Sequence, residues 1–159
     1  MATSSLPIAI TVGDVAGIGP EIIVKAFRDS PAQMLNCVVI GDVAAMQRAV
    51  EVVAQAQPQV PMPFVERIDA LDVCACLPEG VLPVWQVGEP WTESTLPALG
   101  RVQASAGARA ADAVMWAAQA ALRGEVSAVV TAPLHKEALA AAGVPFPGHT
   151  ELLQACAAA

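Results

Sequence analysis

The sequence has no tyrosine, and only 4% of its 159 residues are aromatic. Basic residues are also few, because 8 Lys and Arg stand against 15 Asp and Glu and give a net charge of -7. Nucleic-acid binders need cations for the phosphate backbone, so this charge argues against that class of partner. No apolar run approaches the roughly 18 residues that span a bilayer, and no basic leader stands at the N-terminus. We therefore expect a cytoplasmic protein without a membrane segment.

Cysteine and histidine are too few, and too poorly spaced, for a familiar metal site. The cysteines are Cys37, Cys74, Cys76 and Cys156, and Cys74-Ala-Cys76 is too tight for a CxxC pair. No second Cys or His pair stands at zinc spacing. We expect free thiols in a reducing compartment and no metal ligands in this chain.

Hydrophobic residues, in contrast, make up 55% of the chain, with 14% charged. This balance excludes disorder, and the length suits one domain or two small lobes. Strands and helices are expected to alternate along the first third, at residues 7–12 (strand), 20–28 (helix), 35–40 (strand) and 43–56 (helix capped by Asp42). Such alternation predicts an α/β fold with a mostly parallel sheet flanked by helices.

Residues 57–100 are rich in proline and are expected to be irregular, with a long loop near 88–100. Irregular strands are expected only in two short apolar runs, 63–68 and 81–87. The alternation then resumes, with elements at residues 101–123 (helix), 126–131 (strand) and 133–142 (helix). Thr150 is expected to cap a last helix.

Three polar segments are expected at the carboxyl ends of the strands, where ligands bind in open α/β sheets. The first, Gly13 to Glu21, has neither GxGxxG nor P-loop spacing, and its spacing alone indicates a tight turn before a helix. Asp14 is its candidate site residue, and we expect Gly17 or Gly19 to have a positive φ or to pack closely against a neighbouring backbone.

The second segment, Thr131 to Lys136, carries a hydroxyl, an imidazole and an ammonium group. These suit an anionic ligand, although a solvated helix end would look the same. The third segment, Gly148-His149-Thr150-Glu151, combines polar side chains with the free amides of a helix start, which bind phosphate or carboxylate well. The alternative is that Thr150 simply caps the helix and His149 is a surface residue.

The strings GDVAGIGPEI, VVIGD, TAPLHKEAL and GVPFPGHTELL occur in this order. Together they resemble the 4-hydroxythreonine-4-phosphate dehydrogenase family of vitamin B6 synthesis, and its relatives that act on phosphorylated threonate and erythronate. The resemblance covers nearly the whole chain and is weakest over 57–100. It implies a two-lobed fold like that of isocitrate and isopropylmalate dehydrogenases, with residues 1–159 as the N-terminal portion, and a homodimer.

The resemblance also implies an activity: oxidation and decarboxylation of 4-phosphohydroxy-L-threonine with NAD and a divalent metal (Zn, Mg or Co). It implies that His149 and Thr150 contact the substrate, and Asp14, Thr131 and Lys136 are further candidates to line the site. The family's three metal-binding histidines lie beyond the GHTE motif, whereas this chain has only His135 and His149.

We therefore expect the chain to be inactive alone, as part of a longer enzyme. Two alternatives stay open. One is a non-catalytic remnant that binds a phosphorylated small molecule or a partner subunit. The other is a dehydrogenase for phosphothreonate or phosphoerythronate.

Overall fold

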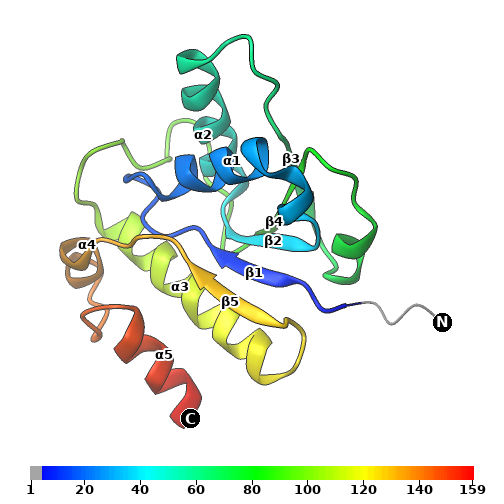
Figure 1. Cartoon of the computed structure of the whole chain (residues 1–159). Helices are drawn as coiled ribbons and strands as arrows, with labels where there is room; N and C mark the ends of the chain where they lie inside the picture. Colours follow the sequence, from blue (N-terminus) through cyan, green and yellow to red (C-terminus); the bar gives the residue numbers. More distant parts are fainter. Residues whose placement is uncertain (1–4) are drawn as a thin grey trace.

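A parallel sheet forms the centre of the computed structural model, which describes residues 5–159 (Figure 1). Its strands are β1 (Ile8–Thr11), β2 (Cys37–Gly41), β3 (Phe64–Ile68), β4 (Val81–Gln86) and β5 (Ala128–Thr131). They lie in the order β3-β4-β2-β1-β5, and every pairing is parallel. In the middle, Thr11 of β1 is level with Ile40 of β2 and Thr131 of β5. The predicted α/β class is confirmed.

Helices cover the two faces of the sheet unequally. They are α1 (Gly19–Asp29), α2 (Val43–Ala56), α3 (Ala104–Leu122), α4 (Lys136–Ala141) and α5 (His149–Ala158), with short 3-10 turns at Pro31–Met34 and Asp72–Cys76. Right-handed crossovers put α1 and α2 on one face, because β1, β2 and β3 follow one another in one direction across the sheet. The return from β4 to β5 puts α3 on the other face (Figure 1).

The short helices α4 and α5 pack on α3. A small apolar cluster joins these three helices, built from Ala111, Val114, Leu139 and Leu152. The main core lies between the sheet and α1, α2 and α3, and its β-branched side chains include Val12, Val38 and Val39, each fully buried. The start of α5 is thereby fixed to α3. No helix in the described part of the chain is both long and apolar enough to cross a membrane.

Several local expectations are confirmed and others are corrected. Asp42 caps α2 as predicted, because its Oδ1 accepts a hydrogen bond from the Ala45 amide at 3.1 Å. The runs at 63–68 and 81–87 are regular strands that pair with each other, not irregular ones. Their pairing explains the difference, since the ladder supplies the regularity that the proline-rich sequence does not suggest.

Two helix starts differ from the prediction. The helix expected from Pro133 begins at Lys136, because the Ala132 amide bonds to Thr11 at the end of β1 and the Pro133 carbonyl bonds to Asp14 beyond it. The last helix begins at His149, with Gly148 as an N-cap that provides no side-chain bond. Thr150 therefore lies inside the first turn and is not the cap.

Candidate functional site

The two segments that follow β1 and β5 are joined at the carboxyl edge of the sheet. The Ala132 amide donates to the Thr11 carbonyl at 3.1 Å, and the Asp14 amide donates to the Pro133 carbonyl at 2.9 Å. Gly13 has a φ of +70°, and a Cβ there would collide with the Pro133 carbonyl. Only glycine permits this approach, so the turn of residues 13–19 and the start of segment 131–136 form one unit.

Asp14 organises this turn from within. The residue is 5% exposed, and its Oδ1 accepts a hydrogen bond from the Ala16 amide at 2.9 Å. Its backbone carbonyl accepts another from the Gly17 amide at 3.0 Å. These bonds hold the turn in shape and occupy one carboxylate oxygen of Asp14.

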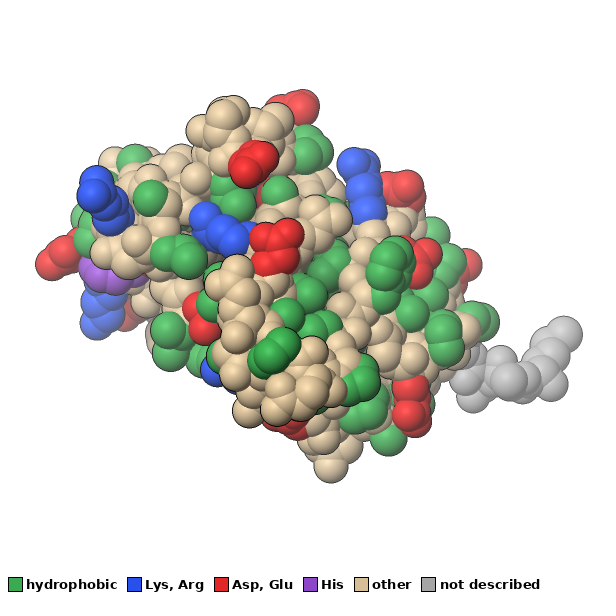
Figure 2. Space-filling model, turned by 90° about the horizontal axis from the view of Figure 1, so that it is seen from above, with side chains coloured by type: hydrophobic (Ala, Val, Ile, Leu, Met, Phe, Trp, Pro, Cys, Tyr) green, Lys and Arg blue, Asp and Glu red, His purple; other side chains and the backbone are tan. Residues whose placement is uncertain are grey.

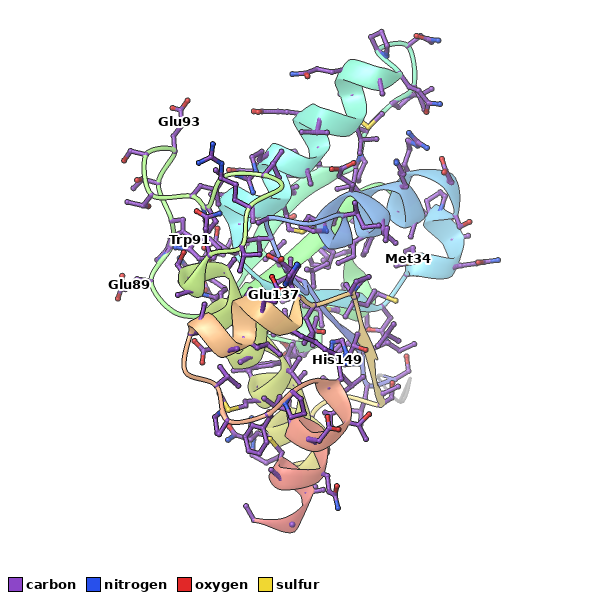
Figure 3. All side chains as sticks on the ribbon, turned by 90° about the vertical axis from the view of Figure 1, so that its left-hand side faces the viewer. Met34, Glu89, Trp91, Glu93, Glu137 and His149 are labelled. Carbon is purple, nitrogen blue, oxygen red and sulfur yellow. The ribbon has the colours of Figure 1, made fainter. Side chains whose placement is uncertain are left out.

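A pocket of about 420 Å³ lies beside this edge, between the starts of α4 and α5. We call it the His149 pocket. Its lining residues are Pro133, Leu134, Lys136, Pro147, Gly148, His149, Thr150 and Glu151. Three predicted site residues thus meet there, namely Lys136, His149 and Thr150, whereas Asp14 and Thr131 are not among the lining residues. Figure 3 shows His149 between α5 and the end of β5, with Glu137 on the neighbouring α4.

His149 is half-buried and lies against the chain just beyond Thr131. Burial lowers the pKa of the imidazole, and an interaction with the backbone of Ala132 partly opposes this decrease. The ring nitrogen Nε2 is buried without a hydrogen-bond partner among the described residues. A buried polar atom without a partner is costly, so this nitrogen is suited to gain one when the pocket is occupied.

The first turn of α5 faces the same pocket with unpaired amides. The first bond of the helix runs from the Leu152 amide to the Gly148 carbonyl at 3.3 Å, so the amides of His149, Thr150 and Glu151 have no acceptor within the helix. These amides, the helix dipole and the Lys136 ammonium favour an anion. The Glu151 carboxylate opposes an anion at the same place.

Basic and acidic side chains are mixed on the surface at this end of the molecule. Figure 2 shows a histidine, Lys or Arg side chains and an acidic side chain together at its left edge, the side on which Figure 1 places α4. Such a mixed surface suits a small anionic ligand rather than a polyanion.

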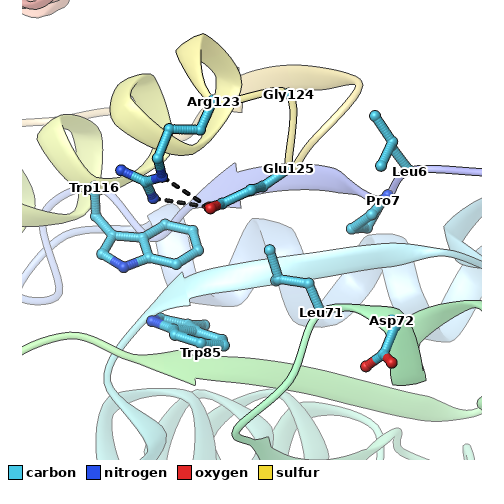
Figure 4. A pocket seen from close by; sticks show the side chains of 9 residues that line it. All are labelled: Leu6, Pro7, Leu71, Asp72, Trp85, Trp116, Arg123, Gly124 and Glu125. Carbon is cyan, nitrogen blue, oxygen red and sulfur yellow. Dashed lines mark hydrogen bonds and ion pairs between the residues drawn. The ribbon is translucent and has the colours of Figure 1, made fainter.

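A larger cavity, of about 630 Å³, lies elsewhere, on the face of the sheet that α3 covers (Figure 4). Its rings Trp85 and Trp116 lie 4.9 Å apart at 36°, and its cation Arg123 is paired with Glu125 at 2.8 Å. An apolar cavity whose cation is already neutralised is a poor place for a phosphate. The His149 pocket is smaller, but its polar groups are better suited to bind a phosphate.

The described residues do not fit a divalent metal ion. Within residues 5–159, no three His, Cys, Asp or Glu side chains are grouped closely enough to hold one. Burial raises the pKa of the Cys74 thiol to about 11, so this sulfur stays protonated and is a weak ligand.

Sequence reasoning missed part of the site. It did not identify Pro133 and Pro147 as walls of the pocket, and it included Glu151 in the third polar segment without giving it a role. The GVPFPGHTELL string contained Pro147 and Glu151, and was the available signal. The hydrogen bond between Asp14 and Pro133 joins residues far apart in sequence and had no local signal.

Comparison with known proteins finds one family model and several relatives that match most of the chain. The family model described as pyridoxal phosphate biosynthetic protein PdxA matches residues 33–159. The chain is 42% identical over 147 residues to the 4-hydroxythreonine-4-phosphate dehydrogenase of Beijerinckia indica, covering 92% of this chain and 40% of that protein. It is 44% identical over 149 residues to the D-threonate 4-phosphate dehydrogenase of Salmonella typhimurium, covering 92% and 42%.

A solved structure shares the fold. The crystal structure of 4-hydroxythreonine-4-phosphate dehydrogenase from Klebsiella pneumoniae superposes with a TM-score of 0.81 at 37% identity, covering 96% of this chain and 44% of that one. The chain thus spans about two fifths of the length of the curated relatives named above.

Proposed function

Because this chain belongs to the family of the pyridoxal phosphate biosynthetic protein PdxA, we propose that it supplies the substrate-anchoring part of a dehydrogenase. The substrate is 4-phosphohydroxy-L-threonine, oxidised and decarboxylated in pyridoxal phosphate biosynthesis. Relatives named as dehydrogenases of such phosphorylated compounds support this assignment. The observation that carries the proposal is the meeting of Lys136 with His149 and Thr150 in one pocket between the starts of α4 and α5.

The groups of the pocket suit one anionic group of a phosphorylated hydroxy acid. The free amides of α5 and the Lys136 ammonium hold a phosphate or a carboxylate. The Thr150 hydroxyl donates a hydrogen bond, and His149 holds or releases a proton on its ring. The Glu151 carboxylate keeps a second anion out of the same space, which orients the substrate.

The remaining chemistry comes from outside this chain. We propose NAD as the oxidant and a divalent metal as the electrophile, both in the full-length enzyme, which acts as a cytoplasmic homodimer. The described residues do not fit a metal ion, and we assign none of them to NAD. Alone, the 159 residues should bind the substrate anion without oxidising it.

Phosphothreonate is a second candidate substrate, because one of the relatives at 44% identity carries the name D-threonate 4-phosphate dehydrogenase. The two compounds differ at the carbon next to the carboxylate, which carries an amino group in the first and a hydroxyl in the second, and both present a phosphate. The His149 pocket, which holds one anion, serves either of them.

The test is a calorimetric titration of this chain with inorganic phosphate, 4-phosphohydroxy-L-threonine and D-threonate 4-phosphate. Lys136→Ala should weaken binding about tenfold through loss of a charge-assisted contact. Lys25→Ala is the matched control, since Lys25 is the other lysine, is exposed on α1 and should leave the Kd unchanged. The preferred substrate is the one with the lower Kd.

Equal binding by wild type, Lys136→Ala and His149→Gln would remove the pocket from the proposal. NADH formation by the chain alone, at a rate near that of its relatives, would overturn the proposed inactivity. The alternative of a non-catalytic remnant would be favoured by two results together. The chain would bind a phosphorylated ligand, and it would show no activity when combined with the C-terminal part of a relative.

A further inference from the structure

The loop of residues 87–103 joins β4 to α3 and is anchored at its beginning by a buried ion pair. Arg109 of α3 donates to Asp42 at 3.0 Å and to the Glu89 carbonyl at 2.8 Å, and its guanidinium lies 4.2 Å from the ring centre of Trp91. Figure 3 shows Trp91 near the start of α3, with Glu89 and Glu93 pointing away from the molecule. The beginning of the loop is therefore fixed to α2 and α3.

A second arginine, Arg48 of α2, joins the later part of the loop to a different element. Its Nη1 donates to the Pro97 carbonyl at 2.6 Å, and its Nη2 donates to the Val15 carbonyl at 2.8 Å. The Gly100 amide adds a bond to the Ala16 carbonyl at 2.7 Å. These bonds attach the loop to the 13–19 turn, next to the candidate site.

Arg48 differs from Arg109 in what it binds. None of the salt bridges among the described residues involves Arg48, so its hydrogen-bonding groups serve two backbone carbonyls. A planar guanidinium holds two acceptors in fixed relative positions, which a lysine cannot do. The side chain thus sets the separation between the loop and the turn.

The turn in question is the one that supports the His149 pocket. Its Asp14 amide bonds to the carbonyl of Pro133, a wall of the pocket, and Gly13 packs against the same carbonyl. The ring of His149 interacts with the backbone of Ala132, the preceding residue. A movement of the turn would therefore move the wall of the pocket and the support of the imidazole.

We propose that Arg48 is a positioning residue for the His149 pocket, acting through the 13–19 turn that it fastens to the 87–103 loop. This inference rests on the proposed function for its consequence in ligand binding. The placement of Asp14 and His149 by Arg48 does not depend on the proposed function and can be tested in the free protein.

The test uses the whole chain in three variants: Arg48→Ala, Arg48→Lys and, as the control, Arg101→Ala. Arg101 lies in the same loop and is exposed. Nuclear magnetic resonance of the free proteins should show displaced signals for the Asp14 amide and the His149 ring in Arg48→Ala. Smaller displacements are expected in Arg48→Lys, which can serve one carbonyl, and none in Arg101→Ala.

Titration with inorganic phosphate gives the second measurement. A Kd raised about tenfold in Arg48→Ala, with Arg101→Ala unchanged, is expected for a displaced binding group. A purely structural arginine would lower the unfolding temperature while leaving the Asp14 and His149 signals and the Kd of the folded protein unchanged, and that result would overturn the proposal.

The outcomes separate this proposal from the proposed function. If wild type does not bind phosphate, the anion pocket fails, while the signals of the free protein still decide the role of Arg48. If Arg48→Ala does not fold, Arg48→Lys decides it: His149 and Asp14 signals identical to those of wild type would refute the positioning role.

Discussion

Gly17 lies in the turn before α1 and Gly19 is the first residue of α1, yet only Gly19 closely contacts a neighbouring backbone. A Cβ at Gly19 would lie 2.6 Å from the Val12 carbonyl oxygen and 3.3 Å from the Cβ of Ala132. At Gly17 the nearest atom, the Asp14 carbonyl oxygen, is at 3.4 Å, an ordinary contact distance. The expectation that one of them is tightly packed is confirmed, for Gly19 and not for Gly17.

The two substitutions to alanine therefore form a matched pair. Gly19→Ala should lower the free energy of unfolding by about 1–3 kcal/mol, because the obstructing atom belongs to the backbone and cannot rotate away. Gly17→Ala should change it by less than about 0.5 kcal/mol. Alanine favours helix more than glycine does, so helix propensity at the start of α1 cannot cause the loss at Gly19.

Urea and thermal unfolding, followed by the fluorescence of the three tryptophans, measure the difference. A loss of this size corresponds to a decrease in Tm of about 3–9 °C for a chain of this length. Equal stability of Gly19→Ala, Gly17→Ala and wild type would refute the reasoning. It would mean that β1 and α1 can move apart to accommodate the added Cβ without a loss in the free energy of unfolding.

Three further predictions concern charge and the sheet edge. Burial lowers the pKa of His149, so as the pH falls below about 6.5 the imidazole takes up a proton in the unfolded chain before it does so in the folded chain. The free energy of unfolding from urea titrations should therefore decrease from neutral to acidic pH, and it should decrease less in His149→Gln than in wild type. Arg109→Met leaves the buried Asp42 carboxylate without its cation and should cost about 3 kcal/mol in the same assay. The exposed Arg123→Met is the control and should have a much smaller effect. Val130 is 51% exposed on β5. Light scattering should show self-association of the wild type, and Val130→Lys should reduce it.

The sequence predicts the fold well where periodicity and local chemistry agree. β1 and β2 are continuous apolar runs, typical of parallel strands buried on both faces, and Asp42 has the side chain and the position of a helix cap. The first helix was predicted from Pro20, which lies at the start of α1. These features are determined by neighbouring residues, which are visible in a single sequence.

Features that depend on long-range pairing could not be predicted in the same way. β3 and β4 are regular only because each pairs with another strand. The helix α4 starts late because Ala132 bonds to the last residue of β1 and Pro133 bonds to Asp14. The site shows the same division. Lys136, His149 and Thr150 were candidates that short motifs suggested, whereas the proposed role of Arg48 depends on two carbonyls from distant segments.

The two edges of the sheet differ in a way that explains the prediction for Val130. β3 has the sequence FVERI, whose Glu66 and Arg67 discourage further pairing, and Pro63 precedes it. β5 has the sequence AVVT, which is apolar and uncharged like an interior strand, yet within residues 5–159 it pairs only with β1. Natural edges are usually protected by charge, proline or a covering element. β5 has none of these within its four residues, so its outer edge is where we expect the described part of the chain to associate with another strand.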